Sequence, residues 1–112
     1  MNPKSLRYTE KKLHFKEGDI IFKEYDEGAK EMYFIDSGRV KIVKKVGDTD
    51  ATLATLDEGD FFGEMSLISG NKRSATAMAF TDCKVHTMDK ETFEYNTTLD
   101  NTFYITILIT DH

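Results

Sequence analysis

The sequence has few of the residues that build covalent or metal-bound scaffolds. Cys83 is its single cysteine, so an intramolecular disulfide is excluded, and no second cysteine is present to build a zinc site with it. We interpret Cys83 as a core residue, because free cysteines are usually buried. A single proline, with 39% hydrophobic and 31% charged residues, favours an ordered globular domain over a disordered chain.

Long apolar runs and an excess of positive charge are also missing. No stretch approaches the roughly 18 apolar residues of a membrane span, and residues 1–15 lack the apolar segment of a signal peptide. The formal net charge is -5, with acidic and basic residues interspersed, which argues against a general affinity for nucleic acid or anionic membranes. We therefore expect a cytoplasmic protein that binds neither nucleic acid nor membrane, and in which any anion site is local.

The pattern of residues 13–88 is that of antiparallel β-structure. Short runs rich in Val, Ile, Phe, Tyr and Thr alternate with breaks that contain glycine or aspartate. Within residues 39–46, apolar and basic side chains alternate so that one face of a strand is apolar. We expect strands at residues 13–16, 20–25, 31–36, 40–46, 51–57, 74–80 and 84–88. They predict a mainly β fold, an antiparallel sandwich or β-roll over about residues 12–88 within a single domain of residues 1–112.

After Met88 the pattern changes to one that favours helices. Asp89 is a good N-cap for a helix that begins at Lys90. The spacing of Phe103 and Ile107 favours a second helical segment over residues 99–110, although its β-branched and aromatic residues also suit a strand. A C-terminal helical segment at about residues 89–110 is therefore expected to flank the β-roll.

Residues 61–77, FFGEMSLISGNKRSATA, interrupt the β-pattern and carry the chemistry. Gly63 lets backbone approach a ligand closely, and residues 64–69 suffice for about one and a half helical turns, whose first amides attract anions. Arg73 would supply a charged fork for the same anion. Taken alone, this pattern indicates a phosphate site of moderate specificity, and a surface salt bridge between Glu64 and Arg73 explains it as well.

The order of the whole segment resembles the phosphate-binding cassette of cyclic nucleotide-binding domains. This family includes kinase regulatory subunits, cyclic nucleotide-gated channels and the bacterial catabolite activator protein. Residues 62–64 (Phe-Gly-Glu) match the family's helix start, and residues 73–75 (Arg-Ser-Ala) match the arginine and small residue that begin its next strand. Residues 15–22 and 31–40 resemble the family's first strand pairs. The resemblance implies the double-stranded β-helix, or jelly roll, of that family.

The resemblance also implies which residues bind the ligand. Glu64 would accept a hydrogen bond from the ribose 2′-hydroxyl, and Arg73 would pair with the ring phosphate. The Arg-Ser pair at residues 73–74 is typical of bacterial cAMP binders, so we expect cAMP before cGMP. The expected ligand-binding residues are Phe62, Gly63, Glu64, Met65, Ser66, Leu67, Arg73, Ser74 and Ala75, where Ser66 and Leu67 would supply backbone amides to the phosphate. Val43 and Leu53 are further candidates for the apolar pocket wall, with plain core packing as the alternative.

These expectations describe a ligand sensor and regulatory domain without a cofactor or metal, not an enzyme. The sequence contains no Walker loop, nucleophile elbow or metalloprotease helix motif. A cupin-like enzyme on a similar β-roll would need clustered histidines with a carboxylate, whereas His14, His86 and His112 are scattered. The other alternative is a degenerate domain that keeps the fold and binds a protein without nucleotide, and the presence of Glu64 and Arg73 counts against it.

Three departures from the family pattern bear on how binding would work. Lys72 stands where many members have proline, and Tyr25 stands where glycine is frequent in a turn. Many members also have a longer final helix that folds over the base. We expect the segment 99–110 or another subunit to cover the base, and the alternative is a base that stays partly exposed. The apolar run 104–109 is a candidate surface for a protein partner or homodimer, with packing onto the β-roll as its alternative. Binding would be relayed through the C-terminal helices to a separate partner.

Overall fold

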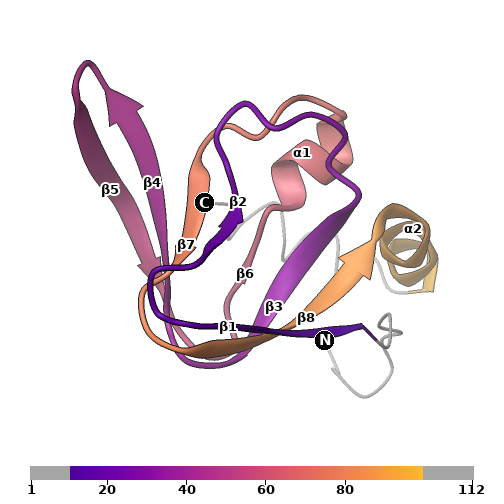
Figure 1. Cartoon of the computed structure of the whole chain (residues 1–112). Helices are drawn as coiled ribbons and strands as arrows, with labels where there is room; N and C mark the ends of the chain where they lie inside the picture. Colours follow the sequence, from indigo (N-terminus) through magenta and orange to yellow (C-terminus); the bar gives the residue numbers. More distant parts are fainter. Residues whose placement is uncertain (1–10, 100–112) are drawn as a thin grey trace.

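The computed structural model describes residues 11–99, which form two antiparallel four-stranded sheets and two helices (Figure 1). The strands are β1 (Lys12–Phe15), β2 (Ile20–Phe22), β3 (Glu31–Ser37), β4 (Val40–Val46), β5 (Thr49–Leu56), β6 (Phe61–Phe62), β7 (Thr76–Ala79) and β8 (Cys83–Asp89), and the helices are α1 (Glu64–Ser69) and α2 (Lys90–Leu99). One sheet has the order β1-β8-β3-β6 and the other β2-β7-β4-β5. This arrangement confirms the predicted β-roll.

The core lies between the two sheets, because each strand turns its apolar face inward. The second sheet contributes Val40, Ile42, Leu56 and Ala77, and the first contributes Tyr33, Ile35, Phe62 and Val85, all of them buried. Cys83 belongs to the same cluster at 1% exposed, which confirms its interpretation as a core residue. A second, smaller cluster joins α1 and α2 across β3 and β8.

Two predicted strands are three residues shorter in the structure than expected. The strand expected at residues 20–25 ends at Phe22, because the carboxylate of Asp26 accepts the N–H of Lys23 at 2.9 Å and turns the chain. The strand expected at residues 74–80 begins at Thr76 and ends at Ala79. A short strand that was not predicted, β6, precedes α1 and pairs with β3.

Helix α2 begins as expected. The backbone N–H of Thr92 donates to Oδ1 of Asp89 at 2.7 Å, so Asp89 is the N-cap of a helix that starts at Lys90. The second helical segment, expected at residues 99–110, and the apolar run 104–109 lie outside the described residues, apart from Leu99 at the end of α2. Within residues 11–99, neither helix is long and apolar enough to cross a membrane.

Helix α1 packs against β3 of the first sheet. Helix α1 follows β6, and the chain then returns through residues 70–75 into β7. Strands β4 and β5 form a long hairpin that extends away from the rest of the roll (Figure 1). The segment that interrupts the β-pattern in the sequence therefore connects β6 of the first sheet to β7 of the second.

Candidate ligand-binding pocket

A pocket lies where α1 and the segments around it meet β2, β4 and β5. It encloses about 490 Å³ of empty space, part of which is open to solvent. Its lining residues are Phe22, Ile42, Leu53, Phe62, Gly63, Glu64, Met65, Ser66, Arg73, Ser74 and Ala75. The segment 62–75 therefore supplies most of the lining, and three strands supply the rest.

The expected ligand-binding residues fall into two groups. All of them except Leu67 line the pocket, and so does Leu53. The side chain of Leu67 is 1% exposed and packs with Met32, Met88 and Phe93 in the smaller core cluster. Val43 is likewise buried, at 8% exposed, and is absent from the lining, which agrees with its alternative interpretation as a core residue.

Leu53 reaches the pocket through an irregularity between β4 and β5. Ile42 pairs with Ala54, but the next residue, Val43, pairs with Thr52, so Leu53 is an extra residue in β5. Such β-bulges redirect side chains and are frequent beside binding sites. The side chain of Leu53 is 58% exposed although it is a large apolar residue. The bulge therefore presents an uncovered apolar side chain to the pocket.

Arg73 is the cation of this pocket, and its residue is only 5% exposed. Its Nη1 donates to the carbonyl oxygen of Gly63 at 2.6 Å, and its Nη2 donates to the carbonyl oxygen of Glu31 at 2.8 Å. Burial lowers the pKa of the Arg73 guanidinium from its ordinary value, while the neighbouring Tyr33 and Glu31 act in the opposite direction. Arginine stays protonated in proteins, so a largely desolvated positive charge lies at the pocket.

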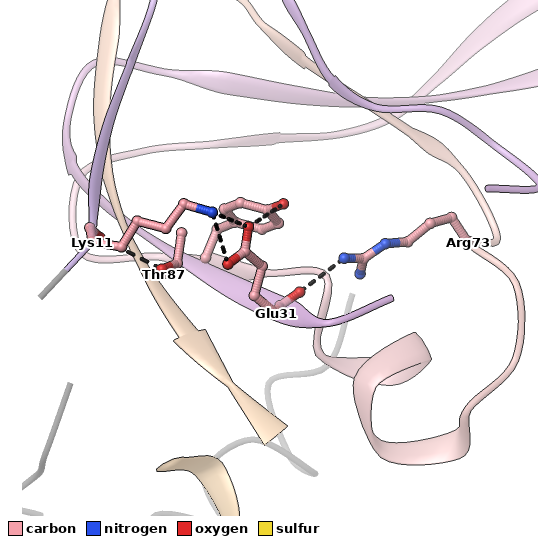
Figure 2. A network of polar contacts seen from close by, with 5 residues as sticks. Lys11, Glu31, Arg73 and Thr87 are labelled. Atoms are coloured by element: carbon pink, nitrogen blue, oxygen red, sulfur yellow. Dashed lines mark hydrogen bonds and ion pairs between the residues drawn. The ribbon is translucent and has the colours of Figure 1, made fainter. Parts of the chain in front are cut away.

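The carboxylate of Glu31 points to Lys11 and Tyr33 and not to Arg73. Figure 2 shows that Glu31 contacts Arg73 through its backbone, while its carboxylate faces Lys11. The Nζ of Lys11 lies 3.2 Å from Oε1 of Glu31, and the hydroxyl of Tyr33 donates to the same oxygen at 3.4 Å. Lys11 is also attached to β8, because its carbonyl oxygen accepts the N–H of Thr87 at 3.2 Å.

Within residues 11–99, Arg73 forms no ion pair with a carboxylate. Buried charged groups are usually paired, because an unpaired charge loses its hydration without compensation. The two carbonyl oxygens offer only partial charges, and they leave further N–H donors of the guanidinium for another acceptor. The guanidinium of Arg73 thus keeps N–H donors that the two carbonyl oxygens do not use.

Glu64 is the acidic residue among those that line the pocket. It is the first residue of α1, where the helix dipole favours a negative charge, and it is 2% exposed. Gly63 precedes it as N-cap with φ of 80° and no side-chain cap. A Cβ at Gly63 would lie 2.9 Å from Nη1 of Arg73 and 3.2 Å from Cε2 of Phe22, so only glycine fits there. Glu64 and Arg73 are therefore brought to one pocket by a close backbone approach.

The two histidines within residues 11–99 are absent from the lining of the pocket. His14 is exposed on β1, and Nδ1 of His86 is 2.5 Å from Oδ2 of Asp36. In the part of the chain that the structure describes, no group of three or more His, Cys, Asp or Glu residues is placed to hold a metal ion.

The family model that describes the cyclic nucleotide-binding domain matches residues 12–95. This chain belongs to that family. A cAMP-dependent protein kinase regulatory subunit of Schizosaccharomyces pombe is 37% identical to it over 79 residues, which are 70% of this chain and 18% of the relative. A cyclic AMP receptor protein of Thermus thermophilus is 34% identical over 90 residues, which are 80% of this chain and 41% of the relative. The domain thus spans less than half of the length of either relative.

Solved structures share its fold. The crystal structure of the Thermus thermophilus catabolite activator protein has a TM-score of 0.81 and 28% identity, covering 88% of this chain and 46% of that one. The EAL enzyme Bd1971 in its cAMP-bound form has a TM-score of 0.75 and 27% identity, covering 88% of this chain and 27% of the enzyme. The same enzyme in its cGMP-bound form has a TM-score of 0.75 and 30% identity. The jelly roll implied by the cassette resemblance is therefore confirmed.

Proposed function

We propose that this domain is a cytoplasmic sensor, not an enzyme, which binds a cyclic nucleotide in the pocket and prefers cAMP. The observation that carries the proposal is the buried cation of Arg73, which lines the pocket together with Glu64 and has no ion pair within residues 11–99. A cyclic nucleotide offers one phosphate anion and one free ribose hydroxyl on a rigid ring system. Arg73 would donate to the phosphate, and Glu64 would accept from the hydroxyl.

The apolar part of the pocket suits the base. Leu53 and Met65 line it and are 58% and 44% exposed, so apolar surface is available for a flat ring. The preference for cAMP is supported by the two relatives, both of which are named for cAMP. Because Bd1971 has been solved with either nucleotide, the exposed Ser74 at the pocket is the position where the choice of base should be tested.

We further propose that ligand binding is relayed to α2 and from there to a protein partner or a second subunit. Leu67 and Ile68 of α1 pack in the cluster that contains Met32, Met88 and Phe93, and Phe93 belongs to α2. A ligand that fixes α1 would act on α2 through this contact. The ligand can shift the equilibrium between two arrangements of α1 and α2 only by the difference in its binding free energy for those arrangements.

Calorimetric titration with cAMP and cGMP tests the binding proposal. We expect Arg73→Ala to weaken cAMP binding by about 100-fold or more, since it removes the charged partner of the phosphate. Arg39→Ala is the matched control, because Arg39 pairs with the exposed Asp57 at 2.8 Å outside the pocket, and it should bind cAMP like the wild type. A folded wild-type protein that gives no heat with either nucleotide would point instead to a degenerate interaction module.

Hydrogen exchange tests the relay separately. Saturating cAMP should slow the exchange of amides in α2 as well as in α1. Exchange in α2 that is unchanged by cAMP, in a protein that binds cAMP, would contradict the relay and leave the binding proposal intact.

A further inference from the structure

The guanidinium of Arg73 lies over the ring of Phe22. The ring centroid of Phe22 is 4.1 Å from Cζ of Arg73, whereas the ring centroid of Tyr33 is 6.0 Å away. The hydrogen bonds of Arg73 run to the carbonyl oxygens of Gly63 and Glu31. All N–H donors of a guanidinium point outward in its plane, so a ring stacked on its face competes with none of them. Phe22 therefore contacts the cation without using a donor that an anion needs.

Phe22 is itself held in place by aromatic neighbours. Its ring centroid lies 5.8 Å from that of Tyr33 and 6.0 Å from that of Phe62, in tilted arrangements that are favourable for aromatic pairs. Tyr33 and Phe62 are in turn stacked with centroids 5.1 Å apart. The ring under Arg73 is thus part of a packed group of three rings.

A β-bulge brings Phe22 to this position. Ile20 pairs with Met78, but Phe22 pairs with Ala77, so Ile21 is an extra residue in β2. Consecutive side chains of a regular strand point to opposite faces, yet Ile21 and Phe22 both pack against the main core while Ile20 is 45% exposed. The bulge is what allows two successive residues to face inward.

The guanidinium is consequently fixed in all directions that matter for orientation. Two carbonyl oxygens accept its N–H groups, and its Cζ lies over the ring of Phe22. On the side of Gly63 there is no room for even a methyl group between the backbone, Arg73 and Phe22. Of these contacts, the contact with Phe22 is the one made by a side chain, so it can be changed by substitution.

We propose that Phe22 is a positioning residue for Arg73, and that its ring sets the affinity of the pocket for the phosphate of the ligand. This inference rests on the proposed function, because the phosphate is the group that Arg73 would bind. A cation in a desolvated site is attracted to the face of an aromatic ring. Without the ring, the guanidinium of Arg73 is free to take other orientations. The free-energy cost of fixing it again when the ligand binds then weakens the affinity.

The test compares Phe22→Leu, which keeps apolar volume and removes the ring, with Phe22→Tyr, which keeps the ring. We expect Phe22→Leu to weaken cAMP binding by about tenfold and Phe22→Tyr to bind within about twofold of the wild type. Phe80→Leu is the matched control, because Phe80 lies under Arg39, 5.4 Å from its Cζ, outside the pocket. It should leave cAMP binding unchanged. A Phe22→Leu variant with wild-type affinity would overturn the inference while the proposed function stands.

A spectroscopic signal distinguishes positioning from a general structural role. The only arginines of the chain are Arg7, Arg39 and Arg73, so their side-chain Nε–Hε resonances can be assigned by substitution. Ring current from Phe22 should shift the Arg73 resonance upfield of free arginine in the ligand-free protein, and the shift should persist in Phe22→Tyr and disappear in Phe22→Leu. An Arg73 resonance at the position of free arginine in the wild type would overturn the inference even if Phe22→Leu does not fold. Failure of the wild type to bind either nucleotide, with the shift present, would overturn the proposed function and with it the role in phosphate binding.

Discussion

The backbones of Tyr25 and Arg73 are joined by a hydrogen bond in which the N–H of Tyr25 donates to the carbonyl oxygen of Arg73 at 2.8 Å. The N–H of Arg73 in turn donates to the carbonyl oxygen of Asp26 at 2.9 Å. Tyr25 has φ of 73° and is the one non-glycine residue with positive φ within residues 11–99. Its side chain is 71% exposed, so little packing offsets the backbone strain. The turn is therefore held in a costly conformation by its pairing with the pocket segment.

We expect Tyr25→Gly to raise the free energy of unfolding by about 0.5–1 kcal/mol. Left-handed backbone costs a non-glycine residue about 1–2 kcal/mol, and the greater freedom of glycine in the unfolded chain cancels part of that gain. Urea denaturation measures the difference. Lys23→Gly is the matched control, since Lys23 is exposed and lacks a positive φ, and it should destabilise. A Tyr25→Gly protein less stable than the wild type would contradict the assignment of strain.

Gly38 should be the glycine of the turns that tolerates substitution least. It has φ of 88°, and a Cβ there would collide with the carbonyl oxygen of Asp82 and lie 2.6 Å from Cβ of Cys83. We expect Gly38→Ala to lower the free energy of unfolding by about 3 kcal/mol or more, because backbone strain and a clash with backbone add. Gly47→Ala, at φ of 64° with nothing within 4 Å, should cost only about 1 kcal/mol. Urea denaturation measures both losses, and equal losses for Gly38→Ala and Gly47→Ala would show that the structure relieves the clash at residue 38.

Much of the roll could be predicted from the sequence because hydrophobic alternation follows which side chains face the core. The prediction is wrong after Phe22, where the carboxylate of Asp26 captures the N–H of Lys23. A side chain that turns the backbone in this way leaves no trace in the periodicity. The β-bulges at Ile21 and Leu53 are hidden for the same reason, since an extra residue alters the pairing and leaves the composition unchanged.

The pocket was accessible from the sequence mainly where a motif marks it, and Leu53 is the one lining residue outside the motif that was named as a candidate. The Phe-Gly-Glu and Arg-Ser-Ala segments predicted residues that the structure does bring to one pocket. Phe22 and Ile42 were missed, because each looks like any other apolar strand residue. The contact of Arg73 with Glu31 could not be foreseen either, since it uses a backbone carbonyl that every residue possesses.

The cap of α2 gives a prediction with a defined pH dependence. The side-chain and backbone hydrogen bonds with Thr92 lower the pKa of Asp89 below its ordinary value of 3.8. Asp89→Ala should lower the free energy of unfolding by about 1 kcal/mol at neutral pH, and Asp89→Asn should cost only a few tenths of that. Because the pKa is depressed in the folded protein, the stabilisation is present above about pH 4 and is lost as the pH falls through the folded pKa.

Urea denaturation of the wild type and Asp89→Ala at about pH 7 and about pH 2 checks this expectation. The difference between the two proteins should shrink at the lower pH, where the carboxyl is protonated. A difference that stays the same at both values would mean that the charge of Asp89 contributes nothing to the cap.

Tyr33 should make the domain sensitive to alkaline pH. Burial, followed by the negative charge of Glu31, raises the pKa of Tyr33 from 10.0 to about 12. The folded value lies above the unfolded one, so the stabilisation is complete below about pH 10 and is lost as the pH rises through about 12. The difference between the two pKa values corresponds to a loss in the free energy of unfolding on the order of 2 kcal/mol.

The variant Tyr33→Phe tests this expectation. It keeps a ring that can stack on Phe62 and should not show the loss of stability that ionisation of Tyr33 causes at alkaline pH. The absorbance of tyrosinate, measured as the difference between wild type and Tyr33→Phe during titration, should rise near pH 12. A midpoint near pH 10 would show that the hydroxyl is solvated in the folded protein.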